Sequence, residues 1–342
     1  MLFSTSEHSL LAVNDQLWVW GSNIFGELGL GHREDVLLPE KVDCVFDYSG
    51  IQSVKSIAFK SFVVTKAGNI YSCGKNDNFQ ITRTDIKETS TFVKNPYLDG
   101  VAIFDTTNYF CLAITHEGKL YIWGKNRNMY ITKPRVVDIE CDRVYNIYCS
   151  YHYALITTSN GLWVMGYYDS YKTSYEEPVK LEFSEHSKIM DIKCSLDLIV
   201  ILTNDDKIFV SSNKKFITIE KNFIEPKICS VSNQIWIIHK DMSDRIFVSR
   251  IFKDVFNNLT LDNKEFDITN IIDIVGRFGI CNNGNIFIVT NDNEVYCKGN
   301  NHHGVLGLGY KGRVDNLQLH PFLSGKKLFD SRNNIVKNAR SG

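Results

Sequence analysis

The chain contains two near copies of one stretch, and this self-similarity limits what it can fold into. Residues 17–31 read Leu-Trp-Val-Trp-Gly-Ser-Asn-Ile-Phe-Gly-Glu-Leu-Gly-Leu-Gly, and residues 295–309 read Val-Tyr-Cys-Lys-Gly-Asn-Asn-His-His-Gly-Val-Leu-Gly-Leu-Gly. Each copy joins an apolar strand to a glycine and then to a glycine-rich turn. Two copies near opposite ends of a 342-residue chain indicate an array of repeats whose middle members have diverged.

Short apolar strands of the same kind recur along the whole chain. They lie 38 to 53 residues apart, which predicts seven repeat units. A glycine follows the strand in five units, whereas Ser212 and Arg250 take its place in the fifth and sixth. The strands span residues 17–20, 70–73, 120–123, 162–165, 208–211, 246–249 and 295–298.

Another apolar strand and a tight turn precede each of these strands. In the second unit, Phe62–Thr65 is followed by the turn Lys66–Asn69. Asn, Asp and Gly at such tips tolerate positive φ, as a tight hairpin requires. Most pairs have one more strand upstream, such as Val54–Phe59, Val144–Cys149 and Ile189–Cys194. Repeated hairpins without helical periodicity predict an all-β fold.

The strands are apolar on both faces, which distinguishes them from the strands of a one-sided sheet. Alternation along residues 17–20 places Leu17 and Val19 on one face, and Trp18 and Trp20 on the other. Sheets covered on both faces fit blades packed radially between neighbours. Seven units therefore predict a seven-bladed β-propeller.

The two ends of the chain carry a prediction about ring closure. Unit one begins at Phe3 and lacks an upstream strand, and Lys326–Asp330 lies where that strand would begin. We expect Lys326–Asp330 to pair with the N-terminal strands, so that the ring has no open edge. Residues 1–331 then form a single propeller domain, and residues 332–342 form a short C-terminal tail.

Composition narrows the possible partners and compartments. The formal net charge is −1, which gives no electrostatic basis for nucleic-acid or anionic-membrane binding. The nine cysteines include no Cys-x-x-Cys and lie mostly within apolar runs, as expected for buried thiols in a reducing compartment. Residues 1–13 lack the features of a signal peptide. We expect a monomeric intracellular protein, cytoplasmic or nuclear, that is not secreted and uses no cofactor.

Residues 17–42 resemble the repeat of the regulator of chromosome condensation family. That repeat has an aromatic strand ending in Trp-Gly, an Asn two residues later, a Gly-x-Leu-Gly-x-Gly turn and a Pro-x-x-Val strand. Here these parts are Trp20-Gly21, Asn23, residues 26–31 and Pro39-Glu40-Lys41-Val42. The resemblance implies a seven-bladed propeller. It also implies either an interaction module or an exchange factor for Ran-type small GTPases.

In this family a His begins the second-last strand of each unit, and the resemblance assigns that position to His8 and His152. We expect both to form hydrogen bonds between blades rather than to act as bases. Residues 307–312 fit the string G-x-G-x-x-G, but they overlap a repeat turn and no helical pattern follows. The adjacent His302 and His303 diverge and have no third ligand at metal spacing. We therefore predict no catalytic, cofactor or metal site.

A run of tyrosines replaces the glycine turn in the fourth unit. Tyrosine beside Ser and Asp makes an adaptable contact surface, although the rings could equally pack against each other. Our leading hypothesis is a non-catalytic propeller that binds a protein partner through its blade loops, and the alternative is a guanine-nucleotide exchange factor for a Ran-like GTPase. The predicted partner-binding residues are Tyr167, Tyr168, Tyr171 and Tyr175.

Overall fold

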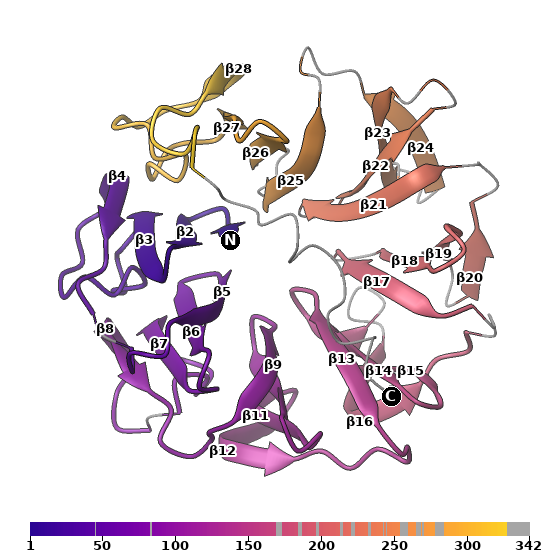
Figure 1. Ribbon diagram of the computed structural model, residues 1–342. Coiled ribbons are helices and arrows are strands. Elements are labelled where there is room, and N and C mark those ends of the chain that lie inside the picture. Colours follow the sequence, from indigo (N-terminus) through magenta and orange to yellow (C-terminus); the bar gives the residue numbers. More distant parts are fainter. Residues whose placement is uncertain are drawn as a thin grey trace.

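A computed structural model of the chain shows seven antiparallel sheets of four strands each, arranged radially around a central axis (Figure 1). This arrangement confirms the predicted all-β seven-bladed propeller. The structure describes residues 1–326 except 45, 83, 169–172, 184–186, 196–197, 213–214, 220–222, 232–233, 242, 244, 254–258, 265–267, 269 and 278–283.

Each blade is built from four strands that follow one another in the sequence. Blades 1 to 3 contain β1 (Leu2–Ser4), β2 (His8–Val13), β3 (Gln16–Gly21), β4 (Val36–Lys41), β5 (Ile51–Ile57), β6 (Lys60–Thr65), β7 (Ile70–Lys75), β8 (Glu88–Lys94), β9 (Val101–Thr106), β10 (Phe110–Thr115), β11 (Leu120–Asn126) and β12 (Met129–Val136). Blades 4 and 5 contain β13 (Val144–Cys149), β14 (Tyr153–Thr158), β15 (Gly161–Tyr168), β16 (Thr173–Lys180), β17 (Ile189–Cys194), β18 (Ile199–Thr203), β19 (Ile208–Ser212) and β20 (Lys215–Thr218). Blades 6 and 7 contain β21 (Ile224–Val231), β22 (Gln234–Lys240), β23 (Ile246–Lys253), β24 (Leu259–Lys264), β25 (Ile271–Arg277), β26 (Asn285–Thr290), β27 (Val295–Gly299) and β28 (Val314–Leu319).

The apolar side chains are buried between neighbouring blades rather than in one shared core. Strands β6, β10 and β14 are buried along their whole length, because both faces of these second strands are covered by adjacent sheets. Separate hydrophobic clusters fill the spaces between blades, including the space between blades 7 and 1. This packing explains how the chain buries its apolar surface without one oversized core.

The glycine after the third strand is fixed by the backbone of the second. Gly21 has φ 109°, and a Cβ there would lie 2.5 Å from the carbonyl oxygen of Glu7. Gly74 repeats the geometry, with φ 99° and a Cβ position 2.2 Å from the carbonyl oxygen of Phe59. A side chain at these positions would meet backbone atoms that have no room to move, so glycine is required.

The loops that follow these glycines are organised by an asparagine. The side-chain oxygen of Asn23 accepts a hydrogen bond from Leu28 N at 3.0 Å, and Asn301 and Leu306 repeat this bond at 2.8 Å. Asn76 does the same with Ile81 N at 3.0 Å. The second unit therefore keeps the loop conformation although its sequence lacks the glycines.

In blades 1 to 3, the residue before the glycine bonds to the loop of the preceding blade. Trp20 Nε1 donates to the Val305 carbonyl at 2.7 Å, which joins blade 1 to blade 7. Trp123 Nε1 donates to the Gln80 carbonyl at 2.8 Å, which joins blade 3 to blade 2. Cys73 Sγ contacts the Glu27 carbonyl at 3.3 Å in the same way. We call these three contacts the inter-blade latches.

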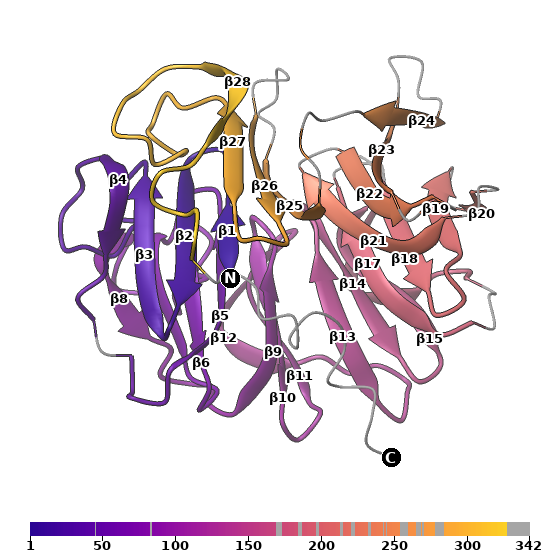
Figure 2. The same ribbon diagram turned by 45° about the horizontal axis from the view of Figure 1, so that its top comes forward.

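Ring closure differs in one respect from the prediction. Unit one does have an upstream strand, because β1 pairs with β2 in the register Leu2↔Leu11 to Ser4↔Ser9 and lies next to β5 and β25 around the axis (Figure 2). Its three residues are too few to show periodicity, which is why the sequence did not reveal it. The predicted pairing segment reaches the described part of the chain only at Lys326, whose ammonium lies 5.9 Å from the Trp18 ring centroid. Residues 327–342, with the predicted tail, lie outside the described residues.

Candidate functional site

One end of the propeller carries the turns between first and second strands and the loops between third and fourth strands. The larger loops at this end follow β3, β7 and β27, and we call this end the long-loop face. The opposite end carries the other connections, including the exposed side chain of Tyr48, which is 93% exposed.

Aromatic side chains run across blades 1 to 4 of the long-loop face. Phe25 lies 5.0 Å from Phe59 between ring centroids, and Phe79 lies 5.7 Å from Tyr130. Tyr109 stacks on His152 at 5.7 Å and lies 5.9 Å from Tyr167. Most of these rings are partly exposed, and Tyr130 is 54% exposed. The aromatic arc consists of Phe25, Phe59, Phe79, Tyr109, Tyr130, Tyr151, His152 and Tyr167.

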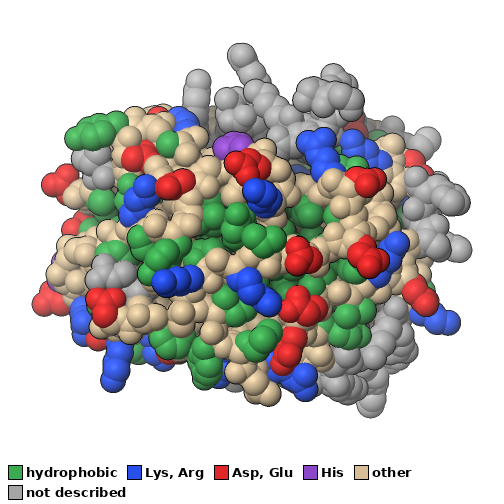
Figure 3. Space-filling model, turned by 90° about the horizontal axis from the view of Figure 1, so that it is seen from below, with side chains coloured by type: hydrophobic (Ala, Val, Ile, Leu, Met, Phe, Trp, Pro, Cys, Tyr) green, Lys and Arg blue, Asp and Glu red, His purple; other side chains and the backbone are tan. Residues whose placement is uncertain are grey.

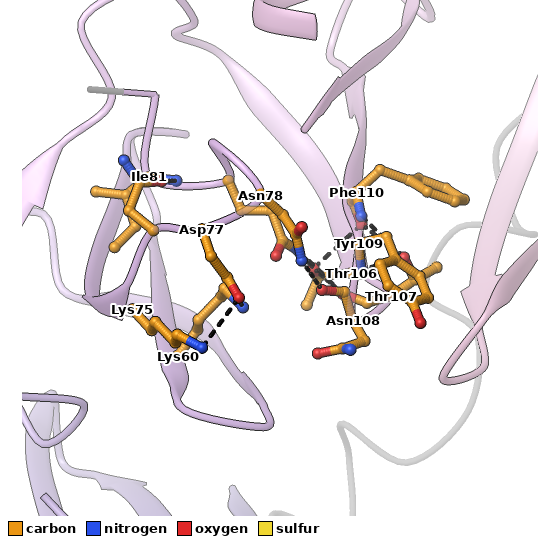
Figure 4. Close-up of polar contacts among 12 residues, drawn as sticks. Lys60, Lys75, Asp77, Asn78, Ile81, Thr106, Thr107, Asn108, Tyr109 and Phe110 are labelled. Atoms are coloured by element: carbon orange, nitrogen blue, oxygen red, sulfur yellow. Dashed lines mark hydrogen bonds and ion pairs between the residues drawn. The ribbon is translucent and has the colours of Figure 1, made fainter. Parts of the chain in front are cut away.

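Hydrogen bonds between blades hold the backbone beneath the aromatic arc. Asn78 Nδ2, from the loop of blade 2, donates to the Asn108 carbonyl of blade 3 at 2.9 Å (Figure 4). The Asn108 amide in turn donates to the Tyr151 carbonyl of blade 4 at 2.9 Å. Thr107 Oγ1 accepts from the amides of Tyr109 and Phe110, which fixes the turn that presents the Tyr109 ring. The arc is therefore preorganised.

A charged cluster lies beside the arc at blade 2. The carboxylate of Asp77 bridges Lys60 Nζ and Lys75 Nζ, each at 3.2 Å (Figure 4). Lys60 is only 2% exposed, whereas Asp77 is 46% exposed. Burial lowers the pKa of Lys60, and the charge of Asp77 partly offsets this effect. Lys75 also lies over the Phe25 ring at 5.1 Å, which joins the cluster to the arc.

The loop that carries Asp77 is strained. Phe79 and Thr82 have φ of 57° and 58°, at the positions where the loop of blade 1 has Gly26 and Gly29 with φ of 78° and 70°. The left-handed region costs a residue with a Cβ roughly 1–2 kcal/mol, and a β-branched residue is seldom found there. Such strain concentrates at sites of binding or switching. We therefore include this loop in the candidate site.

The axial channel encloses about 2560 Å³ and is lined by the first strands of the blades. Six of its charged side chains form three ion pairs. Lys55 and Asp105 lie 3.1 Å apart, Lys193 and Asp191 2.9 Å, and Lys227 and Asp273 3.3 Å. The pairs Lys55–Asp105 and Lys227–Asp273 join neighbouring first strands, whereas Lys193 and Asp191 lie on one strand, β17. Within the described residues, no group of three or more His, Cys, Asp or Glu side chains could hold a metal ion.

The rim between β12 and β16 offers no comparable feature. Figure 3 shows hydrophobic side chains there interleaved with basic and acidic ones. Arg135 and Glu177 form an exposed pair at 2.9 Å across blades 3 and 4. Lys133 lies over the ring of Tyr97 at 5.0 Å. Charged and hydrophobic side chains are mixed on this rim, whereas the arc gathers partly exposed aromatic rings.

Of the four tyrosines predicted to bind a partner, the three in the described part of the chain do not share one surface. Tyr167 belongs to the aromatic arc, but Tyr168 is 7% exposed and packs edge-on against Tyr153 at 5.5 Å. Tyr175 is half-buried on β16 and packs against the core between blades 4 and 5. Tyr171 lies outside the described residues. Tyr167 pairs with Ser174 in a β-ladder, so the side chains of Tyr167 and Tyr168 point to opposite faces of the sheet. The sequence alone did not show that this segment is a strand.

The histidine assignments are confirmed in one case and shifted in the other. His8 is fully buried, and its Nε2 lies 2.8 Å from Ser61 Oγ of blade 2, as expected for a bond between blades. Burial lowers the pKa of His8 to about 3. The position of His8 opposite Gly21 is held in blade 4 by Tyr153 opposite Gly166, so the assignment of His152 was wrong by one residue. Tyr153 donates its hydroxyl to the Ser195 carbonyl of blade 5 at 3.0 Å.

Sequence reasoning missed the other members of the arc because they come from four different blades. Phe59 and Tyr109 occupy the same turn in blades 2 and 3, immediately before the residues that face Gly74 and Gly124. Aligning the units at that glycine would have placed both rings on one face. The strained loop gave a further signal, since Asn76 stands two residues after Gly74 just as Asn23 follows Gly21.

Comparison with known proteins agrees with this geometry. The model of the regulator of chromosome condensation (RCC1) repeat matches residues 14–59. The secretion-regulating guanine nucleotide exchange factor of Mus musculus is 37% identical over 87 residues, which cover 25% of this chain and 19% of that protein. The chain thus matches about a fifth of the length of this relative. In the described part of the chain, no helix is long and apolar enough to cross a membrane.

Solved structures match over nearly the whole chain. Yeast RCC1 (Prp20), bound to Kap60, superposes with a TM-score of 0.70 and 16% identity over 91% of this chain and 85% of that one. Prp20p from Saccharomyces cerevisiae, studied with its binding to Gsp1p and histones, gives a TM-score of 0.67 with 16% identity over 93% and 87%. The repeat match, the seven blades and these superpositions lead to one conclusion. The chain contains a regulator of chromosome condensation (RCC1) repeat at residues 14–59 and has the seven-bladed propeller fold of the yeast RCC1 structures.

Proposed function

We propose that the chain is a non-catalytic protein-interaction propeller whose partner docks on the long-loop face over the aromatic arc. The observation that carries the proposal is the series of ring contacts that join neighbouring blades from blade 1 to blade 4. The ring of Tyr109 in blade 3 contacts the rings of both His152 and Tyr167 in blade 4. Aromatic side chains dominate the binding energy of protein interfaces when they gather at one place.

Preorganisation of the arc supports the same proposal. The bonds from Asn78 to Asn108 and from Asn108 to Tyr151 fix three blades relative to one another beneath the rings. A surface that is ordered before binding loses less conformational entropy when a partner docks. Tyr and Phe also lose little, because each has only two rotatable side-chain bonds.

The second candidate function is guanine-nucleotide exchange on a Ran-like small GTPase. It is favoured by the similarity to the mouse exchange factor, which covers 25% of this chain. Exchange would require a loop that disturbs the contacts of the nucleotide's phosphates and Mg²⁺. The strained loop around Asp77 is the described segment best suited to such a role.

Cross-linking in cells tests the docking proposal. We compare the wild-type chain with a variant carrying Tyr109→Ala, Tyr130→Ala and Tyr167→Ala, and with Tyr48→Ala on the opposite end as the matched control. The proposal expects a partner that cross-links to the wild type and to Tyr48→Ala, with a loss of about tenfold or more in the arc variant. Equal yields from all three proteins would overturn it.

Nucleotide release separates the two candidate functions. The purified chain is added to a panel of small GTPases loaded with fluorescent GDP. A non-catalytic propeller leaves every release rate within about twofold of the intrinsic rate, whereas acceleration of about tenfold or more on one member would establish exchange instead. The arc variant is included, because true exchange through this face would be lost with it.

A further inference from the structure

The Asp77 cluster has an excess of positive charge and lies within the face proposed for docking. One carboxylate serves both Lys60 and Lys75 at 3.2 Å each. We propose that the partner presents an acidic segment, and that one of its carboxylates takes the place of Asp77 between these two lysines. This inference rests on the proposed function and names the chemistry of the partner.

The first support is the unusual burial of Lys60. The same position, opposite the glycine of the third strand, holds His8 in blade 1, Tyr153 in blade 4 and Asn285 in blade 7. Each of these side chains is uncharged or, for His8, kept neutral by burial, and each bonds to the next blade. The charged form of a lysine that is 2% exposed is stabilised by an anion beside it, here the carboxylate of Asp77. The site is therefore selective for a carboxylate or a similar anion.

The second support is that the present anion can leave. Asp77 is 46% exposed, and it lies in the loop strained at Phe79 and Thr82. Strain lowers the difference in free energy between this loop conformation and others, so that a competing carboxylate displaces Asp77 more easily. In the corresponding loop of blade 1 glycines hold the same conformation without that strain.

The third support is the charge around the cluster. Lys75 lies 5.1 Å from the centroid of the Phe25 ring, and Lys125 lies 5.1 Å from that of Tyr130. A hydrogen bond with Tyr130 raises the pKa of Lys125, which keeps its ammonium charged. Cations set against aromatic rings match a segment in which acidic and hydrophobic residues alternate.

Fluorescence anisotropy with designed peptides tests the inference on the full chain. The probe is a fluorescein-labelled peptide of alternating Glu and Phe, and the matched peptide replaces Glu with Gln. We expect the Glu peptide to bind about fivefold tighter, near the upper limit for exposed ion pairs. Asp77→Asn should tighten Glu-peptide binding by about fivefold, because it removes the internal competitor.

Lys75→Gln provides a second variant. Lys75 is half-buried, and its replacement leaves the ion pair between Lys60 and Asp77 in place. It should weaken Glu-peptide binding by about fivefold, while Lys66→Gln on the opposite end leaves it unchanged. Inorganic phosphate at millimolar concentration should compete only weakly. Complete displacement by phosphate would overturn the acidic segment in favour of a phosphate ligand.

The two proposals fail in different ways. If both peptides bind equally well and the triple arc variant binds neither, the docking proposal stands, but the proposal that a partner carboxylate replaces Asp77 is overturned. The proposal of an acidic segment is also overturned if neither peptide binds, or if Asp77→Asn binds the Glu peptide more weakly than the wild type does. Docking itself is decided by the cross-linking yields, which do not depend on either peptide.

Discussion

The residue next to the motif glycine position on the third strand bonds to the preceding blade in blades 1 to 3, but bonds within its own sheet in blades 5 and 6. In blades 1 and 3, Trp20 and Trp123 reach across to a loop carbonyl of the preceding blade at 2.7 and 2.8 Å. In blade 5 the corresponding Ser211 accepts a hydrogen bond from Ile199 N at 2.9 Å within its own sheet. In blade 6 the corresponding Ser249 lies 2.9 Å from His239 Nε2, again within one sheet.

The comparison explains what the repeat motif encodes. Blades 5 and 6 keep four paired strands each, although they lack the Trp or Cys and the glycine. The motif is therefore not needed to form a blade. It marks the contacts by which one blade holds the loop of its neighbour, and divergence in the middle of the chain removed these contacts while leaving the strands intact.

The largest expected effect comes from breaking a latch. Trp123 is fully buried between blades 2 and 3, and Trp123→Ala should lower the free energy of unfolding by about 3–5 kcal/mol. Ser211→Ala, at the same position of blade 5, should cost only about 1 kcal/mol. Urea denaturation followed by circular dichroism measures both. Comparable losses would contradict the distinction between the two regions.

Trp123→Phe isolates the hydrogen bond from the packing. It keeps an aromatic ring and removes the donor, so the Gln80 carbonyl is left without the bond that it receives at 2.8 Å. This variant also remains informative if Trp123→Ala does not fold. We expect a loss of about 1–3 kcal/mol.

The second effect depends on pH and concerns His8. Its pKa is about 3 in the fold, because burial disfavours the charged form, whereas an unfolded chain has a pKa near 6.5. Between these values the unfolded state binds a proton that the native state does not, so stability falls as pH falls through this range. From pH 7 to pH 5 the loss from His8 alone should be about 2 kcal/mol.

His8→Gln provides the test. Urea denaturation of the wild type and the variant at pH 7, 6 and 5 should show their free energies of unfolding converging by about 2 kcal/mol as pH falls. His320, whose pKa is lowered to about 4 mainly by burial, stays in both proteins and cancels from the difference. Parallel pH curves would show that His8 is not kept neutral in the fold.

The sequence was sufficient for the fold because the blade signal is repeated. Seven apolar strands and the glycines at 21, 74, 124, 166 and 299 established the number of blades, although the three-residue β1 was missed. The candidate site was not predictable in the same way. Phe25, Phe79 and Tyr109 are isolated aromatic residues in separate units, and only the radial packing of the blades brings them to one face. Tyr168 is buried although it stands next to the partly exposed Tyr167, because neighbours in a strand face opposite ways.

The smallest expected effect concerns the loop of blade 2, which keeps the conformation of a glycine loop without its glycines. Thr82→Gly removes a β-branched residue at φ 58°, which relieves roughly 1–2 kcal/mol of strain, while the freedom that glycine gains in the unfolded chain costs about 0.5–1 kcal/mol. The net result should be a gain of up to about 1 kcal/mol, measured by urea denaturation. Gly29→Ala, at the matching position of blade 1, should be destabilising, because its Cβ would lie 2.3 Å from the Phe92 ring at an unfavourable φ of 70°. If Thr82→Gly were instead destabilising, then the hydroxyl, which donates to the Ile81 carbonyl at 2.7 Å, would contribute more than the strain, and this loop would be as firmly held as its glycine counterparts.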